Sequence, residues 1–143
     1  MRCLIDTNIL IHTIDKRDLL KQELAIRLLC VLNPDDTALP AQVLAEYANV
    51  SLKKFRMPAD QVYQHLQAYQ ASFVIVSLTP AVVLEAVRGV RDHQLSYFDA
   101  QIWAAAKLNQ IPIILSEDFN TGATLEGVHF VNPFESGFDI ESV

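Results

Sequence analysis

The chain alternates between short apolar runs and longer segments in which apolar residues recur every three or four positions. The short runs indicate buried strands, and the longer spacing indicates amphipathic helices. The predicted strands are residues 2–6, 37–39, 73–78, 111–115 and 128–131. The predicted helices are residues 8–14, 18–32, 41–55, 58–71, 80–91 and 96–108. Strands that alternate with helices predict an α/β fold with a mainly parallel sheet and right-handed crossovers.

Three segments of this pattern carry more specific predictions. Residues 73–78 form a continuous run rich in β-branched residues, which is typical of a strand buried on both faces. Residues 128–131 are predicted to form an edge strand. Residues 132–143 are polar and acidic and are expected to form a loosely ordered tail. Neither repeats nor linkers divide the chain, so residues 1–143 are predicted to form a single domain.

Length and composition agree with one globular domain. The chain has 143 residues, of which 51% are hydrophobic and 20% charged, so it can bury a substantial core. No apolar run approaches the roughly 18 residues that span a bilayer, and the first acidic residue comes too early for a signal peptide. A cytoplasmic location is therefore expected. Cys3 and Cys30 show no metal-binding or disulfide spacing and are predicted to be reduced core residues.

The net charge of −6 argues against a general affinity for nucleic acid. Proteins bind phosphates mainly through Lys and Arg side chains that displace counterions from the nucleic acid. A bound divalent cation would reverse the charge locally, however. The question raised by the charge is therefore whether acidic side chains converge on one cation.

Four acidic residues stand where an apolar segment ends or an apolar helix begins. They are Asp6, Glu46, Asp99 and Asp118. In open parallel sheets, ligands bind beyond the carboxyl ends of the strands, and Asp6 and residues 116–118 fall there. Several carboxylates that face one cleft repel one another unless a hard cation with a preference for oxygen lies between them. This arrangement indicates a metal site.

Each acid also has a simpler explanation when it is taken alone. Asp6 suits a helix N-cap, and Asp99 suits the first turn of a helix, where it interacts with the helix dipole. Glu46 suits a solvated helix face, and Asp118 suits a turn. Together the simpler explanations are weak, because four coincidences would have to produce one ordered pattern.

Four motifs, taken in order, resemble the PIN domain. They are Ile5-Asp6-Thr7-Asn8, Glu46 on a later helix, Leu95-Ser96-Tyr97-Phe98-Asp99-Ala100, and Ile114-Leu115-Ser116-Glu117-Asp118-Phe119. In particular, they resemble the VapC-type toxin ribonucleases of bacterial type II toxin–antitoxin systems. The resemblance extends over about the whole chain, and four motifs in suitable strand and helix contexts are more specific than any one of them.

The resemblance implies a three-layer α/β/α sandwich and metal-dependent hydrolysis of RNA. It assigns Asp6, Glu46, Asp99 and Asp118 as an acidic quartet that holds one or two Mg²⁺ or Mn²⁺ ions. Its supporting polar residues are Thr7, Asn8 and Ser116. The partners that it implies are an RNA substrate, a cognate antitoxin and a second copy of the chain in a homodimer. Glu117 is an additional acid next to Asp118, and the sequence leaves open which of the two faces the metal.

The sequence also offers candidate RNA contacts and two alternatives to the ribonuclease function. Lys53, Lys54 and Arg56 are candidates to contact an RNA backbone, although positive charge at a helix C-terminus is common. A PIN-like scaffold without catalysis is one alternative. A phosphatase-like hydrolase with Asp6 as the nucleophile is another. It is disfavoured because an enzyme of the haloacid dehalogenase type would need a second acid at the position of Asn8.

Overall fold

A computed structural model describes residues 2–142 and contains one sheet of six strands in the order β3-β2-β1-β4-β6-β5. The strands are β1 (Cys3–Ile5), β2 (Thr37–Pro40), β3 (Val74–Val76), β4 (Ile113–Leu115), β5 (Thr124–Leu125) and β6 (Val128–Val131). All neighbouring strands pair in parallel except β5 and β6, which form an antiparallel hairpin. The sheet is therefore mainly parallel, as the sequence predicts.

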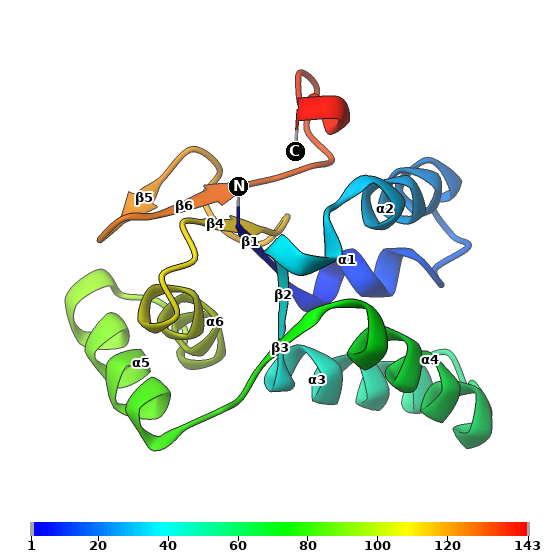
Figure 1. The fold of residues 1–143 in the computed structure, drawn as a ribbon, viewed down its shortest axis with the longest axis horizontal. Coiled ribbons are helices and arrows are strands. Elements are labelled where there is room, and N and C mark those ends of the chain that lie inside the picture. The colour runs from blue at the N-terminus through cyan, green and yellow to red at the C-terminus, as the bar shows by residue number, and fades with distance from the viewer. Residues whose placement is uncertain (1, 143) are drawn as a thin grey trace.

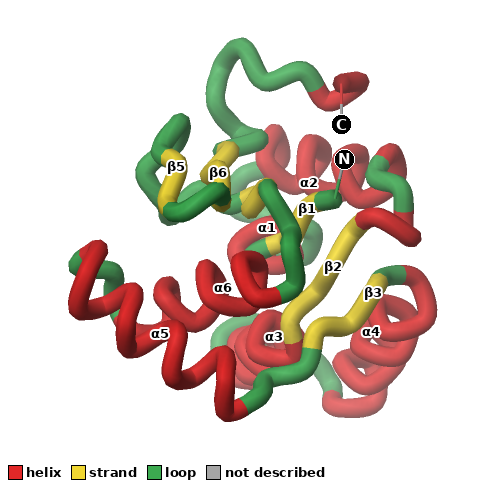
Figure 2. The backbone as a smooth tube through the Cα atoms, turned by 60° about the vertical axis from the view of Figure 1, so that its left-hand side comes forward, coloured by secondary structure: helices red, strands yellow, loops and turns green. Residues whose placement is uncertain are grey.

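Six α-helices and two short 3-10 helices connect the strands. The α-helices are α1 (Thr7–His12), α2 (Leu19–Val31), α3 (Ala41–Lys53), α4 (Ala59–Ser72), α5 (Pro80–His93) and α6 (Tyr97–Leu108). The 3-10 helices are η1 (Pro34–Asp36) and η2 (Ile140–Ser142). Helices α5 and α6 pack together on one side of the sheet, and the first four helices lie on the other side (Figure 1). The tube in Figure 2 shows the strands between these two helical layers. The three-layer α/β/α prediction is thus confirmed.

Local side-chain chemistry explains where several helices begin. Asp18 caps α2 by accepting a hydrogen bond from the backbone N–H of Lys21 at 3.1 Å. Thr79 caps α5 in the same way, and Pro80 occupies the first turn, where its missing N–H costs nothing. Asp6 is the N-cap of α1, so the cap expected from the sequence is present. The same carboxylate also takes part in the candidate site.

The core lies on both faces of the sheet and includes large side chains from every layer. Trp103 of α6 and Tyr47 of α3 are fully buried. The Trp103 indole N–H donates to the carbonyl oxygen of Leu125 at 3.2 Å, which fixes the ring. Gly89 of α5 lies directly against this ring, because a Cβ at that position would be 2.8 Å from Trp103 Cζ3. The close contact between α5 and α6 therefore depends on a residue without a side chain.

Three predictions about burial and strand position are wrong. β3 contains only three residues and is an edge strand with Val74 and Ile75 exposed, because no further strand pairs with its outer side. β6 is not an edge strand, since it lies between β4 and the short β5. Cys30 is exposed on α2 instead of buried, whereas Cys3 is buried in β1 as expected. Apolar runs reveal strands well, but their order in the sheet depends on pairing with distant segments.

The segment after β6 packs against the rest of the protein. Phe134, Phe138 and Ile140 are partly buried against the core, and Arg27 Nη2 donates to Glu141 Oε1 at 2.9 Å. A cavity of about 520 Å³ separates this segment from α2. Loose order of residues 132–143 stays a prediction. Across residues 2–142, none of the helices combines the length and the apolar character that crossing a membrane requires.

Candidate active site

The candidate site lies at the carboxyl ends of the two central strands, β1 and β4. Ile5 is in register with Leu115, and the backbone N–H of Asp6 donates to the Leu115 carbonyl oxygen at 3.0 Å. Asp6 and Ser116 are therefore the first residues beyond two adjacent parallel strands. The crossovers leave these strands in opposite directions, so their carboxyl ends form the switch point at which α/β sheets bind ligands.

Asp6 is almost completely buried and is held by two short hydrogen bonds. Its Oδ1 accepts from the backbone N–H of Thr7 at 2.7 Å, and its Oδ2 accepts from Ser116 Oγ at 2.7 Å. Burial raises the pKa of Asp6 to about 6, against the lowering effect of these two hydrogen bonds. The negative charges of Asp118 and Glu46 make a smaller contribution to this rise in the pKa. Asp6 is thus a carboxylate whose ionised form is costly in the absence of a cation.

Asn8 connects Asp6 to Asp118. Its Nδ2 donates to Asp118 Oδ2 at 3.0 Å and to Ser116 Oγ at 3.0 Å, and it lies 3.4 Å from Asp6 Oδ2. The backbone N–H of Glu117 donates to Asn8 Oδ1 at 3.3 Å, which orients the amide. The supporting polar residues predicted from the sequence therefore lie between the acids.

Glu117 is directed away from this network. Its carboxylate accepts from Lys21 Nζ at 2.8 Å and lies 2.6 Å from His12 Nε2. Burial alone would raise the pKa of Glu117, but the hydrogen bonds from Lys21 and His12 outweigh it and hold the pKa below its usual value. Of the two neighbouring acids, Asp118 is the one whose side chain shares hydrogen-bond partners with Asp6. Sequence spacing carries no signal for the pairing of Glu117 with α1 and α2.

Glu46 joins the site from α3. Thr7 Oγ1 donates to Glu46 Oε2 at 3.0 Å, and Gln42 Nε2 donates to Glu46 Oε1 at 2.5 Å. Gln42 Nε2 also donates to the carbonyl oxygen of Phe98 at 3.2 Å, and Gln42 Oε1 accepts from Gln101 Nε2 at 2.7 Å. Gln42 and Gln101 were not among the residues predicted from the sequence. Gln42 precedes Glu46 by four residues, and this helical spacing is the signal that could have identified it.

Asp99 is less closely tied to the other three acids. It is half-buried in the first turn of α6, and its side chain makes no hydrogen bond to any of residues 2–142. The bond between Gln42 and the Phe98 carbonyl nevertheless places this turn against the first turns of α3. Lys53 and Lys54 lie at the other end of α3, about 10 Å along the helix from Glu46 at 1.5 Å per residue.

A hollow of about 360 Å³ opens next to Glu46. Its walls come from α3, the loop after β3 and α6, and its lining is Gln42, Ala45, Glu46, Leu78, Phe98 and Gln101. Phe98 is 65% exposed although it is a large aromatic residue. An exposed aromatic ring next to carboxylates offers a flat apolar surface on which another planar ring can stack.

The donor set suits Mg²⁺ or Mn²⁺ in chemical type. Asp6, Glu46 and Asp118 offer carboxylate oxygens, which hard divalent cations prefer, and a cation would relieve the repulsion that raises the pKa of Asp6. Among residues 2–142, no group of three or more His, Cys, Asp and Glu side chains is arranged to hold an ion. The carboxylates are instead directed by their hydrogen bonds to Ser116, Asn8 and other partners. Binding one ion through three acids would therefore require rotation of these side chains.

Comparison with known proteins identifies the family. The PIN domain family matches the chain over residues 3–122, which covers both central strands and all six α-helices. The chain belongs to the PIN domain family. No curated protein matches its sequence. The PIN-domain prediction made from the four motifs is confirmed.

Toxin–antitoxin proteins are among the solved structures with a similar fold. This PIN domain is 25% identical to a chain of a toxin–antitoxin complex from Klebsiella pneumoniae, with a TM-score of 0.70 and coverage of 93% of this chain and 98% of that one. VapC20 of Mycobacterium tuberculosis, described as a sarcin-ricin loop cleaving toxin, gives 17% identity, a TM-score of 0.68 and coverage of 87% and 97%. VapBC2 of Rickettsia felis, solved with a promoter DNA fragment, gives 15% identity and a TM-score of 0.62, with coverage of 91% of this chain and 97% of that one.

Proposed function

We propose that this PIN domain is a metal-dependent endoribonuclease and the toxin of a toxin–antitoxin pair. The observation that carries the proposal is the hydrogen-bonded network that joins Asp6, Glu46 and Asp118 at the carboxyl ends of β1 and β4. Hydrolysis of a phosphodiester requires an activated water and stabilisation of negative charge on the phosphate. A Mg²⁺ or Mn²⁺ ion in this site would supply both when bound.

The chain's own residues have distinct roles in this proposal. Asp6, Glu46, Asp118 and Asp99 are the carboxylates that hold one or two ions. Ser116 Oγ and the backbone N–H of Thr7 donate to the two oxygens of Asp6 and so hold its carboxylate at the carboxyl ends of β1 and β4.

Thr7 and Asn8 act as positioning residues. Thr7 Oγ1 orients Glu46, and Asn8 holds the carboxylate of Asp118 close to that of Asp6. Water attacks in line with the leaving oxygen, and the products carry a 5′-phosphate and a 3′-hydroxyl.

The proposal that the protein is a toxin rests on its similarity to a protein of a toxin–antitoxin complex. The Klebsiella pneumoniae structure is a toxin–antitoxin complex, and the structural match extends over 98% of the chain compared there. We infer that a cognate antitoxin binds this protein and covers the acidic site, and that the active form is a homodimer in the cytoplasm. Expression of the protein alone should arrest growth, and co-expression of the product of an adjacent small gene should restore it.

Two other functions make different predictions. A phosphatase-like mechanism with Asp6 as the nucleophile needs a second acid two residues later. That position holds Asn8, whose amide donates to Asp118. A scaffold without catalysis would bind a partner but leave RNA intact whatever metal is added.

The deciding experiment follows cleavage of a labelled single-stranded RNA with Mn²⁺. Asp6→Asn and Asp99→Asn should each lower the rate by at least about two orders of magnitude, the typical loss for a main electrostatic stabiliser. Wild-type rates in both variants would leave only the scaffold function.

A further inference from the structure

The positive charges of this acidic protein are distributed unevenly. The chain has eleven Lys and Arg residues, and six of them form ion pairs with acids. Within residues 2–142, the other five have no acidic partner within ion-pair distance, and these are Arg2, Lys16, Lys53, Lys54 and Arg56. Four of the five belong to two short segments, residues 14–17 and 53–56.

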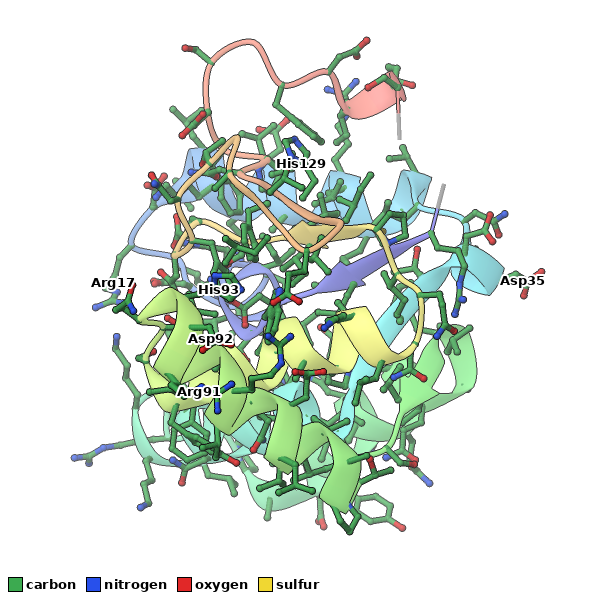
Figure 3. All side chains as sticks on the ribbon, turned by 90° about the vertical axis from the view of Figure 1, so that its left-hand side faces the viewer. Arg17, Asp35, Arg91, Asp92, His93 and His129 are labelled. Carbon is green, nitrogen blue, oxygen red and sulfur yellow. The ribbon has the colours of Figure 1, made fainter. Side chains whose placement is uncertain are left out.

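These two segments meet at one concave surface, which we call the basic pocket. It has a volume of about 290 Å³ and is lined by Ile14, Asp15, Lys16, Arg17, Lys54 and Phe55. Lys53 and Arg56 adjoin it in sequence and are exposed. Arg17 lies at the periphery of the molecule, as Figure 3 shows.

An aromatic ring lies between the cations of the basic pocket. The Arg17 guanidinium carbon is 5.9 Å from the centroid of the Phe55 ring, and Lys54 Nζ is 5.8 Å from it. Arg17 is held in place by Asp15, which accepts from its Nε at 2.9 Å and from its Nη2 at 2.7 Å. These bonds hold the pKa of Asp15 well below its usual range, so the pair stays ionised. Cations next to an aromatic face suit a nucleotide, which offers both phosphate and base.

The basic pocket lies at the far end of the two helices that carry the acidic site. Helices α1 and α3 both begin at the acids and pack against each other, and they run in the same direction away from the sheet (Figure 1). Lys53 follows Glu46 by seven residues, which places both on one face of α3 about 10 Å apart. A strand bound at the acids could therefore reach the basic pocket by following this face.

We propose that the basic pocket binds backbone phosphates of the RNA strand whose scissile phosphate lies at the acidic site, with Phe55 stacking on an unpaired base. This inference rests on the proposed ribonuclease function and adds the path of its substrate. The helix dipole accounts for positive charge at the end of α3, but it does not account for Lys16 and Arg17, which come from a different segment. In a protein with a net charge of −6, these cations supply the phosphate affinity that the rest of the surface opposes.

The test uses a double variant, Lys16→Ala with Lys54→Ala, and a matched control, Arg91→Ala. Arg91 is exposed on α5, on the opposite side of the sheet from α1 and α3 (Figures 1 and 3). Cleavage of a fluorescein-labelled single-stranded RNA with Mn²⁺ gives KM and kcat for each protein. The double variant should raise KM about tenfold with little change in kcat, because it loses two phosphate contacts remote from the chemistry. The control should match the wild type.

Binding is measured separately, so that the inference and the ribonuclease function can fail independently. Anisotropy of the same RNA is recorded with Mn²⁺ in an Asp118→Asn background, at salt concentrations from about 50 to 200 mM. Loss of two contacts should reduce the slope of log affinity against log salt by about 1.4. If the wild type binds RNA through these lysines but never cuts it, the ribonuclease function fails and the basic pocket stands.

Two outcomes would overturn the inference. The first is an unchanged KM and salt slope in the double variant while the wild type cleaves normally. The second is competition by poly-L-glutamate that is as strong as competition by unlabelled RNA, because the basic pocket would then be a site for acidic protein. Circular dichroism of the double variant must match that of the wild type, and Lys16→Gln with Lys54→Gln serves as a second variant if it does not.

Discussion

Replacing Asp6 by asparagine should stabilise the metal-free protein at neutral pH and destabilise it near pH 4. Folding raises the pKa of Asp6 from 3.8 to about 6, so the ionised carboxylate costs about 3 kcal/mol of folding free energy above pH 6. Asparagine removes this cost. It also turns one oxygen into a donor, so the bond from Ser116 Oγ is lost at about 1 to 2 kcal/mol. The net gain expected at pH 7.5 is about 1 to 2 kcal/mol.

The sign of the effect follows from which state binds the proton more tightly. The folded-state pKa of Asp6 lies above its unfolded value, so this group favours folding at low pH and loses that contribution as the pH rises from about 4 to about 6. Below pH 4, Asp6 is largely protonated in the folded wild type, so the variant removes no unfavourable charge and only loses the hydrogen bond from Ser116. The difference in unfolding free energy between variant and wild type should therefore rise by about 2.4 kcal/mol between pH 4 and pH 7.

Urea unfolding in EDTA, followed by circular dichroism at several pH values, measures this difference directly. Asp35→Asn is the matched control, because Asp35 is exposed in η1 at the edge of the molecule (Figure 3). The difference in unfolding free energy between Asp35→Asn and the wild type should not show this rise between pH 4 and pH 7. Parallel stability curves for Asp6→Asn and wild type would refute the claim that burial and neighbouring acids destabilise the Asp6 carboxylate.

Three further predictions test other parts of the structure. Asp118→Asn should reduce Mn²⁺-dependent RNA cleavage at least about tenfold more than Glu117→Gln, and equal losses in the two rates would contradict the assigned orientation of the two acids. Asp99→Asn should shrink the rise in melting temperature that Mn²⁺ causes, and scanning fluorimetry that shows an unchanged rise would remove Asp99 from the metal site. Gly89→Ala should lower the unfolding free energy by about 1 to 3 kcal/mol through overlap with Trp103, and a wild-type urea midpoint would contradict that packing.

The sequence predicted the six α-helices and five of the six strands of residues 2–142, because these have a local signal, and it missed the two-residue β5. The helices have caps and apolar spacing of their own, as at Asp18 and Thr79. Strand order in the sheet has no such local signal. The run that contains β3 looks like a central strand in sequence, yet its outer edge is unpaired in the structure. Pairing between distant segments decides that position.

The candidate site was predictable to a similar degree. The strand ends placed Asp6 and Ser116 together, because parallel strands end on the same side of a sheet. The role of Glu117 could not be predicted in the same way. Glu117 is withdrawn from the site by Lys21, which is 96 residues away, and only the folded structure brings these two side chains together.

The basic pocket shows the same limit for a surface. The sequence shows a positive charge run at the end of a helix, formed by Lys53, Lys54 and Arg56. The helix dipole is sufficient to explain that run. Lys16 joins them only after α1 and α3 have packed side by side. The pocket is thus a property of the tertiary structure.

The ribonuclease function is tested by cleavage of a labelled single-stranded RNA with purified wild-type protein. A metal-dependent endoribonuclease should cleave this RNA with Mg²⁺ or Mn²⁺ and leave products with a 5′-phosphate and a 3′-hydroxyl. It should not cleave the RNA in excess EDTA, because carboxylates without a cation repel phosphate. Asp6→Asn should be at least about two orders of magnitude slower under the same conditions. Undiminished cleavage in EDTA, or no cleavage with either metal, would rule out the proposed metal-dependent ribonuclease.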